Sequence, residues 1–380
     1  MPQLTFLFLA FSAGVVLAYW LIPPDWRSVF LAISGSVFLA CLDSVSFVIL
    51  CLLTVIVFFH ARKPATGTGH HLVVPGLLLL LCAARLTPLI RTQWRMAHLV
   101  VLLGLGFYLL KLIHYWIEMR ANSFRPHRFL DFYNFMIFFP TVTIGPIHRF
   151  EDFLRSARRN RWNAQMFAYG LERILYGYVK VIVIANWLIA LQMLTLVSKW
   201  QPVPAGFSIV LDSLVFGLHL YFTFAGYSDI AIGLSLLLGY QMCENFNHPF
   251  LKSNIGKFWQ SWHMSLSAWC RQYVFLPCFA KWRNLPIALV ATMAAIGLWH
   301  EFSIRFLLWG LYHGFGILIW RWYQSRLLPK LPHFENRIWK WAGTTLSIGL
   351  TFSFVILGFT IPRSSSFMEI VRNFQSIIGL

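Results

Sequence analysis

The sequence predicts an all-α polytopic membrane protein with a single membrane domain over residues 1–380. Three observations predict this fold class. Hydrophobic side chains make up 58% of the chain and charged ones only 12%, whereas about a quarter of the residues in a soluble domain are charged. The mean hydropathy is +0.65. The 17 Trp and 13 Tyr suit the two interfaces of a bilayer, so much of the surface is expected to face lipid.

Charge-poor runs of about 20 residues mark the expected membrane spans in order along the chain. The first run has no basic n-region and no clear cleavage pattern, which favours a retained helix over a cleaved signal peptide. The second is long enough for two short helices, so roughly ten or eleven crossings are expected. The runs are 3–22, 28–60, 72–90, 97–118, 129–147, 166–198, 206–240, 285–299, 304–323 and 341–361.

The formal charge of +18 comes from short basic clusters between the apolar runs. This distribution is typical of the positive-inside bias and of contact with anionic lipid head groups, and no nucleic-acid partner is expected. The stretch 149–161 holds five arginines against Glu151 and Asp152, which makes it the best candidate for a cytoplasmic loop. The six cysteines form no C-x-x-C pair, so neither a disulfide framework nor a metal site is predicted.

Residues 246–286 form neither a clean span nor a soluble loop, because polar and aromatic side chains alternate there. Irregular backbone at membrane depth is tolerated only where it is buried in protein or lines a cavity. We therefore expect re-entrant or interfacial helices that line an internal chamber.

Two histidines are the candidate catalytic residues. His300 ends an apolar run, and a neutral imidazole there can take a proton from a hydroxyl nucleophile, because its unperturbed pKa is about 6.5. His263 lies in the aromatic segment, where a polar group can position a donor carbonyl or stabilise an oxyanion. The two lie too far apart in sequence to share a helical face, so their pairing is a hypothesis about tertiary structure. The alternative is that His300 only binds a neighbouring carbonyl.

Asp229 is an acidic residue deep in an apolar stretch. An ionisable group inside a span is a functional candidate, but a basic partner or a helix end is the preferred explanation for this one. The sequence contains no G-x-S-x-G elbow, P-loop or metal-ligand spacing, so serine hydrolase, phosphoryl-transfer and metal chemistry find no support.

Several short motifs carry a family resemblance. They are Phe138-Phe139-Pro140 with Gly145-Pro146-Ile147, the run Gly226 to Gly233, Glu244-Asn245-Phe246-Asn247, Phe258-Trp259 with Trp262-His263-Met264-Ser265-Leu266, and Leu298-Trp299-His300 with Trp309-Gly310 and His313-Gly314. In this order they resemble the membrane-bound O-acyltransferase (MBOAT) family, in the bacterial branch of alginate O-acetyltransferase and the DltB-like D-alanyl transfer protein. The resemblance runs from about Gly104 to Gly316, the expected family core, and continues more weakly to the C-terminus.

The resemblance implies a multi-helix fold around a central tunnel, with His300 matching the catalytic histidine and His263 the second conserved polar position. It implies a thioester donor, acyl-CoA or an acyl carrier protein, presented from the cytoplasmic side as co-substrate, with no bound cofactor. The acceptor would be a hydroxyl of an extracytoplasmic polymer or its carrier. Further residues are expected to line the chamber and bind substrate: Trp262, Trp299, Asn245, Tyr227, Ser228 and Asp229.

Some positions depart from the family pattern. Asn186 stands where relatives often show Asp, Thr223 replaces the middle residue of Phe-Asp-Phe, and Gln260 and Ser261 replace basic residues before Trp-His. Glu301 replaces the small residue after Trp-His, and it could raise the basicity of a nearby imidazole if it turned inward. These changes bear on the choice of acceptor and donor and leave both histidines in place.

The function expected from these residues is O-acylation, acetyl transfer being favoured, of a polysaccharide or cell-envelope polymer. A bacterial inner-membrane, multi-pass location and an extracytoplasmic partner transferase are expected with it. D-alanyl transfer to a teichoic-acid-type polymer is an alternative of the same class. From other classes, a transporter that relays protons through its histidines and a non-catalytic scaffold stay open, although the lack of an inverted repeat argues against the transporter.

Overall fold

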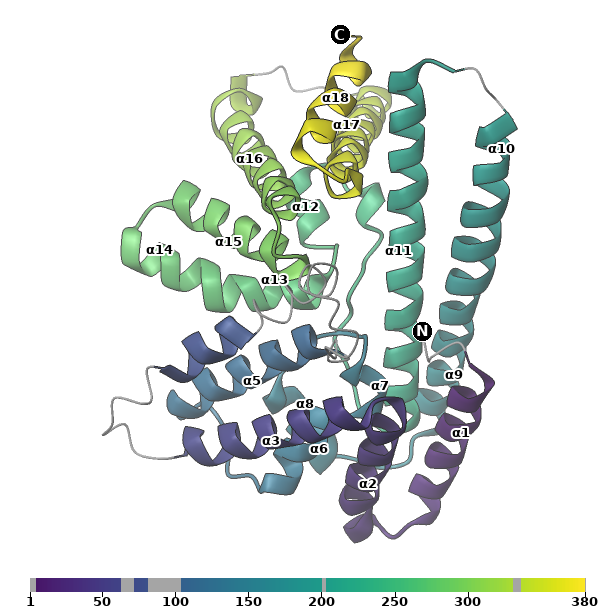
Figure 1. Ribbon diagram of the computed structural model, residues 1–380, viewed down its shortest axis with the longest axis vertical. Coiled ribbons are helices and arrows are strands. Elements are labelled where there is room, and N and C mark those ends of the chain that lie inside the picture. Colours follow the sequence, from purple (N-terminus) through teal and green to yellow (C-terminus); the bar gives the residue numbers. More distant parts are fainter. Residues whose placement is uncertain (1–4, 63–71, 81–103, 200–202, 331–335, 380) are drawn as a thin grey trace, which may run out of the picture. The chain divides into compact units, whose positions relative to one another are not determined.

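The computed structural model describes residues 5–62, 72–80, 104–199, 203–330 and 336–379, and every element within these ranges is a helix (Figure 1). Within the described ranges, five helices are long and apolar enough to cross a membrane, and two shorter ones are also apolar. The prediction of an all-α polytopic membrane protein is confirmed. The long apolar helices are Pro24–Leu42, Ser44–Ala61, Ala164–Leu196, Ala205–Leu237 and Arg337–Arg363; the shorter ones are Phe6–Leu21 and Leu285–His300.

The chain forms two compact units, each made of two stretches of sequence. Unit 1 comprises Met1–Tyr178 and Gly226–Cys243, and unit 2 comprises Val179–Ala225 and Glu244–Leu380. The single membrane domain predicted from the sequence stays a prediction. Much of the expected span at 72–90 lies outside the described residues, as does the start of the one at 97–118.

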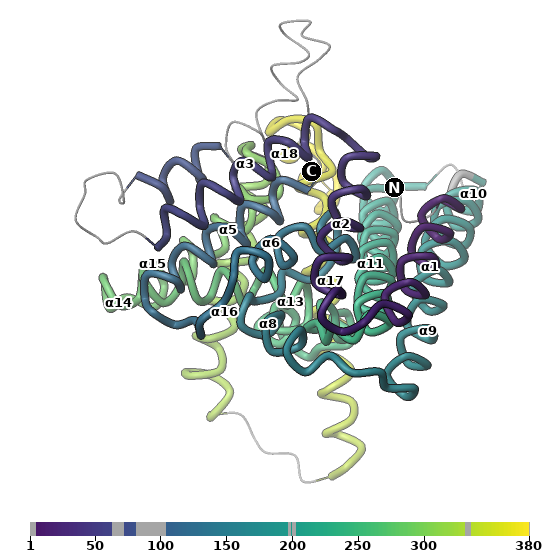
Figure 2. Tube along the Cα trace, turned by 90° about the horizontal axis from the view of Figure 1, so that it is seen from below, coloured from purple at the N-terminus to yellow at the C-terminus, as the bar shows by residue number. Residues whose placement is uncertain are grey.

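Unit 1 holds the N-terminal helices around an aromatic core. Figure 2 shows α3 and α5 side by side, and α2 packs against α1, α3 and α6. Four buried rings contact one another in this core: Phe132 stacks on Tyr115 and Phe135, and Phe150 meets Tyr115 and Phe135 edge-on. The helices are α1 (Phe6–Leu21), α2 (Pro24–Leu42), α3 (Ser44–Ala61), α5 (Leu105–Arg120), α6 (Phe129–Ile137), α7 (Phe139–Val142), α8 (Phe150–Arg158) and α9 (Ala164–Tyr178).

Two stretches of unit 1 refine the sequence predictions. The long run 28–60 forms two helices, as expected, and Asp43 caps the second by accepting from the Val45 backbone N–H. The run 129–147 is not one span, because α6 ends at Ile137 and a short new helix, α7, begins beyond it. Pro140 explains the break, since it has no backbone N–H to donate to the Met136 carbonyl four residues earlier and its ring crowds that carbonyl.

The last stretch of unit 1 packs α9 against the C-terminal part of α11 (Ala205–Leu237) through glycines. A Cβ added at Gly177 would lie 2.6 Å from the Gly226 carbonyl oxygen, and one at Gly233 would lie 2.6 Å from the Gly170 carbonyl oxygen. Such small residues let two helix backbones approach closely.

The described part of unit 2 contains a long π-helix, a set of short helices and several longer helices. α15 and α16 form an antiparallel hairpin joined by residues 301–303. The stretch 246–286 forms only short helices, as its mixed pattern predicts, and its depth in a membrane stays a prediction. The helices are η3 (Val179–Met193), α10 (Leu194–Lys199), the first part of α11, η4 (Pro249–Leu251), α12 (Ile255–Trp259), α13 (Met264–Cys270), η5 (Arg271–Phe275), α14 (Leu276–Trp282), α15 (Leu285–His300), α16 (Ile304–Arg326), η6 (Leu328–Lys330), α17 (Arg337–Arg363) and α18 (Phe367–Ile378).

Candidate active site

His263 lies at the N-cap of α13, and its backbone is left-handed, with φ 43° and ψ 53°. Side chains with a Cβ seldom adopt this conformation, so the surrounding structure must enforce it. Asn245 supplies part of that restraint. Its carbonyl oxygen accepts from the Met264 backbone N–H at 2.8 Å, and its Oδ1 accepts from the Ser265 hydroxyl at 2.9 Å. These bonds hold in place the two residues that follow His263.

His300 is the last residue of α15. The helix ends there because Glu301 adopts an extended backbone, with φ −155°. Three aromatic side chains surround the imidazole: the ring centroid of Trp299 lies 4.9 Å away, that of Trp309 5.5 Å and that of Phe306 6.0 Å. The hairpin of α15 and α16 therefore sets the position of this histidine.

The two imidazoles lie together in unit 2. Their ring centroids are 6.4 Å apart, with an angle of 67° between the rings. Both line a cavity of about 140 Å³, and they are the only titratable side chains among the described residues that do so. The tertiary pairing hypothesised from the sequence is therefore present. The lining consists of Phe216, Leu220, Phe224, Phe246, Trp262, His263, His300, Phe306, Trp309, Phe359 and Pro362.

The cavity keeps His263 in its neutral form. The residue is 3% exposed, and burial lowers the pKa of its imidazole to about 4, because the charged form loses its hydration. At neutral pH one ring nitrogen therefore carries a hydrogen and can donate a hydrogen bond. His300 is only half-buried. The two histidines thus occupy different environments within one cavity.

The remaining predicted site residues fall into different places. Trp262 lines the cavity, and Trp299 packs against the His263 ring with the centroids 5.9 Å apart. Tyr227, Ser228 and Asp229 belong to unit 1. The Asp229 carboxylate there binds the Arg173 guanidinium at 2.5 Å, and the side chains are only 7% and 13% exposed, so Asp229 does hold a basic partner. Their roles in substrate binding stay predictions.

The sequence did not single out the apolar side chains that shape the cavity. Phe306 and Phe359 line it, yet nothing in sequence distinguishes them among 36 phenylalanines. Trp309 did stand in a motif, beside a glycine that lets α16 approach α15. Within the described ranges no group of three His, Cys, Asp or Glu side chains could hold a metal ion. The arrangement suits proton transfer to or from a small substrate in a largely apolar site.

Comparison with known proteins decides the family. Residues 90–355 match the model of MBOAT, the membrane-bound O-acyltransferase family. This chain belongs to the MBOAT family. The resemblance predicted from the motifs is confirmed, and the MBOAT match reaches beyond the core expected at about 104–316 on both sides.

Three relatives illustrate where the chain stands within the MBOAT family. It is 31% identical over 299 residues to the probable alginate O-acetylase AlgI of Pseudomonas aeruginosa, covering 75% of this chain and 53% of that protein. It is 32% identical over 288 residues to the teichoic acid D-alanyltransferase of Streptococcus thermophilus, covering 68% and 67%. It is 27% identical over 278 residues to the peptidoglycan O-acetyltransferase of Helicobacter pylori, covering 68% and 49%. The chain spans about half the length of the alginate O-acetylases it matches.

Proposed function

We propose that this protein transfers a small acyl group, acetyl being favoured, from a cytoplasmic thioester donor to hydroxyls of an extracytoplasmic polysaccharide or cell-envelope polymer. The observation that carries the proposal is the pair of imidazoles, 6.4 Å apart, that line one small and largely apolar cavity. Membership of an O-acyltransferase family supports the reaction class.

The reaction needs no nucleophile from the protein. His300 accepts the proton of the acceptor hydroxyl as its oxygen forms a bond to the thioester carbonyl carbon. His263, neutral at working pH, donates a hydrogen bond to the carbonyl oxygen, where negative charge develops. The tetrahedral intermediate then collapses, the carbon–sulfur bond breaks, and the thiolate takes the proton from His300. The products are an ester and a free thiol.

The size and lining of the cavity favour a short acyl group. Its volume of about 140 Å³ is close to that of an engineered cavity of about 150 Å³ that holds one benzene molecule. An acetyl group fits within such a space. Nine of the eleven lining side chains are apolar, so few groups would compete with the reacting hydroxyl for the thioester.

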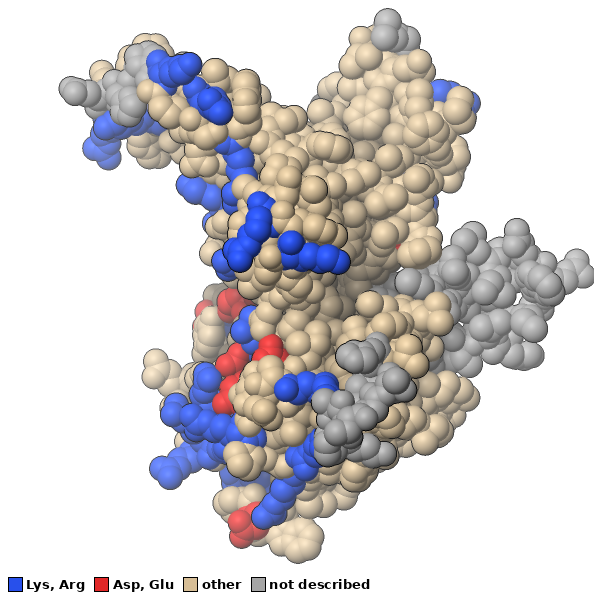
Figure 3. All heavy atoms as spheres, turned by 90° about the vertical axis from the view of Figure 1, so that its left-hand side faces the viewer, with Lys and Arg blue, Asp and Glu red and all other residues tan. Residues whose placement is uncertain are grey.

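The basic surface of unit 2 supports a cytoplasmic donor. Figure 3 shows Lys and Arg side chains spread over the face that carries α14 and α16. Lys281 of α14, Arg283 just after it, and Arg321 and Arg326 of α16 are all exposed. Basic residues gather on the cytoplasmic side of membrane proteins, and both CoA and acyl carrier proteins are anionic. We place the protein in the inner membrane of a bacterium, with a carrier or CoA on this side and a polymer or partner transferase on the other.

Purified protein in detergent tests the proposal with a labelled acyl thioester and an oligosaccharide acceptor. His300→Ala should reduce transfer by roughly 100-fold or more, since general base catalysis contributes about 10²–10⁴-fold. His263→Ala should also reduce it. The matched control is His219→Ala, because His219 pairs with Asn186 and lies outside the cavity lining. Transfer by His300→Ala at the wild-type rate would refute the catalytic proposal and favour a transporter or scaffold.

D-alanyl transfer is the second candidate. The alignment covers 67% of the Streptococcus thermophilus D-alanyltransferase but only 53% of the alginate O-acetylase, so the chain matches the shorter relative over more of its length. A competition assay with acetyl and D-alanyl thioesters of the same carrier separates the two. A preference for the D-alanyl donor would overturn acetyl as the favoured group.

A further inference from the structure

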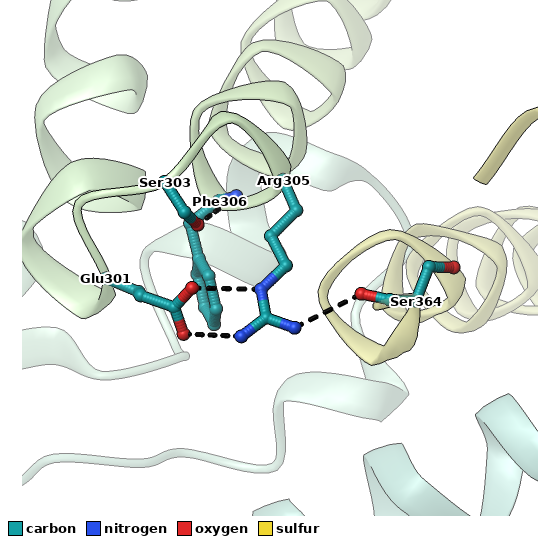
Figure 4. A network of polar contacts seen from close by, with 5 residues as sticks. All are labelled: Glu301, Ser303, Arg305, Phe306 and Ser364. Carbon is teal, nitrogen blue, oxygen red and sulfur yellow. Dashed lines mark hydrogen bonds and ion pairs between the residues drawn. The ribbon is translucent and has the colours of Figure 1, made fainter. Parts of the chain in front are cut away.

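A forked ion pair follows His300 in the chain and is linked to it through Phe306, whose ring centroid lies 6.0 Å from that of His300 and 5.7 Å from the Arg305 guanidinium carbon. The Arg305 guanidinium at the start of α16 donates from Nε to one Glu301 carboxylate oxygen at 2.9 Å and from Nη2 to the other at 2.7 Å. Its third nitrogen, Nη1, donates to the Ser364 carbonyl oxygen at 3.2 Å. Figure 4 shows the guanidinium between the two partners. One side chain thus binds the end of α15 and the end of α17 at the same time.

Each of these residues is close in sequence to the cavity wall. His300 precedes Glu301, Phe306 follows Arg305, and Pro362 stands two positions before Ser364, and all three neighbours line the cavity. A shift of α16 or α17 at this point would therefore move the wall around the imidazole. The forked geometry restricts such shifts more than a single hydrogen bond would.

The ion pair also sets the charge next to His300. The other titratable group at the cavity is His263, which burial keeps neutral, and the lining side chains from α11, α16 and α17 are uncharged. Without a partner, Glu301 would bring a full negative charge to the end of α15, one residue after His300. The guanidinium compensates for it, because both carboxylate oxygens accept from Arg305.

We propose that Arg305 is a positioning residue for His300: it compensates for the Glu301 carboxylate that this chain carries after its Trp-His motif, and it fixes α15, α16 and α17 around the imidazole. The proposal rests on the proposed function of His300 as the base. Arg305 itself need not touch either substrate. It acts by keeping the imidazole in place and available for the acceptor proton.

Variants that remove one charge each should shift the pH profile of kcat/KM in opposite directions. A merely structural role would not produce such opposite shifts. Arg305→Gln leaves Glu301 uncompensated, which stabilises the imidazolium, so the acidic limb of the kcat/KM profile should move up by about half to one pH unit. Glu301→Gln leaves the Arg305 cation, so the limb should move down by a similar amount. The double variant Glu301→Gln with Arg305→Gln should return the midpoint close to the wild-type value. Shifts of equal sign in the two single variants, or no shift in either, would overturn the proposal.

Two matched variants separate charge from geometry. Arg363→Gln removes one positive charge from the end of α17, where Arg363 binds Asp212 at 2.9 Å with similar exposure, and the midpoint should not move. Arg305→Lys keeps the charge but loses the fork, so kcat should fall roughly several-fold at an unchanged midpoint. If Arg363→Gln shifted the midpoint as much as Arg305→Gln, the loss of any nearby positive charge would have this effect. That result would contradict the proposal.

A readout without activity distinguishes this proposal from the proposed function. Protein labelled with [¹³Cε1]histidine gives one signal per histidine, and the signal lost in His300→Ala identifies His300. Its titration midpoint should move up in Arg305→Gln and down in Glu301→Gln. If wild-type protein transfers no acyl group but these shifts appear, the proposed function fails and the charge compensation stands. If transfer occurs and the His300 signal does not shift, only the role of Arg305 fails.

Discussion

At the scale of single residues, the site depends on side chains that hold others in place. Asn245 is 2% exposed, and its carbonyl and side-chain oxygens accept from the two residues after His263. The sequence predicted Asn245 as a chamber-lining residue, but among the described residues it does not line the cavity that holds the histidines. Its observed contacts instead restrain the left-handed backbone at His263. A sequence motif alone does not show this restraint.

Asn245→Ala should therefore lower kcat more than it lowers stability. Loss of the bond to Ser265 frees the start of α13, and a displacement of about 1 Å at a reacting group can cost up to about 100-fold in rate. We expect a reduction of roughly 10-fold in kcat by steady-state assay. The control is Asn336→Ala, which removes an ordinary helix cap at Ile338 and should leave kcat unchanged. Equal kcat in Asn245→Ala and wild type would contradict the positioning role.

The Arg173–Asp229 ion pair gives a second residue-scale prediction. Asp229→Ala leaves a buried guanidinium charge, so unfolding free energy should fall by about 3–5 kcal/mol, measured by thermal denaturation in detergent. The double variant Asp229→Leu with Arg173→Met should recover most of that stability, because paired apolar side chains can replace a buried ion pair. Recovered stability with recovered transfer would assign Asp229 a structural role. Recovered stability without transfer would support the substrate-binding role predicted from the sequence.

At the scale of helices, hydropathy predicted the long elements well and their interruptions poorly. The runs 206–240, 285–299 and 341–361 match α11, α15 and α17 within a few residues. The run 166–198 begins as α9 but continues from Val179 to Met193 as a π-helix, and no residue pattern marks that change. Apolar length decides whether a helix forms in a membrane, whereas local winding depends on neighbours that the sequence does not display.

The close packing of α9 on α11 leads to a prediction at this scale. Gly177→Ala places a methyl group 2.6 Å from the Gly226 carbonyl oxygen, so the helices must separate, and stability should fall by about 1–3 kcal/mol. Gly343→Ala is the matched control, because a Cβ at Gly343 of α17 meets nothing within 4 Å. That variant should be neutral or stabilised by up to about 1 kcal/mol from helix propensity. Thermal unfolding of both proteins checks the difference, and an equal midpoint would argue against tight glycine packing.

At the scale of the molecule, composition was sufficient to predict the fold class, and the order of the motifs was sufficient to predict the family. Apolar content excluded a soluble protein, and the two histidine motifs indicated the residues that the fold brings to 6.4 Å. The sequence could not predict the division into two units or the apolar cavity wall, because both depend on contacts between residues that are distant in the chain. Sequence identified the reactive groups here, and tertiary packing determined their surroundings.

The basic face of unit 2 predicts a salt effect on donor binding. If Lys281 and Arg283 attract an anionic donor, KM for acetyl-CoA should rise several-fold between about 0.05 M and 0.3 M salt, with kcat nearly unchanged. Lys281→Glu with Arg283→Glu should raise KM at low salt and weaken its salt dependence. A neutral N-acetylcysteamine thioester is the control donor, and its KM should not depend on salt. Equal salt dependence for both donors would exclude electrostatic steering of the donor.

The left-handed backbone of His263 has a consequence for engineering. Glycine adopts this conformation without strain, so His263→Gly keeps the loop while it deletes the ring, whereas His263→Ala disturbs both. The glycine variant would also leave a ring-sized vacancy at the edge of an existing cavity. Free imidazole added to that variant has a place to bind, and chemical complementation of this kind would turn a constitutive transferase into one that is switched on by a small diffusible molecule.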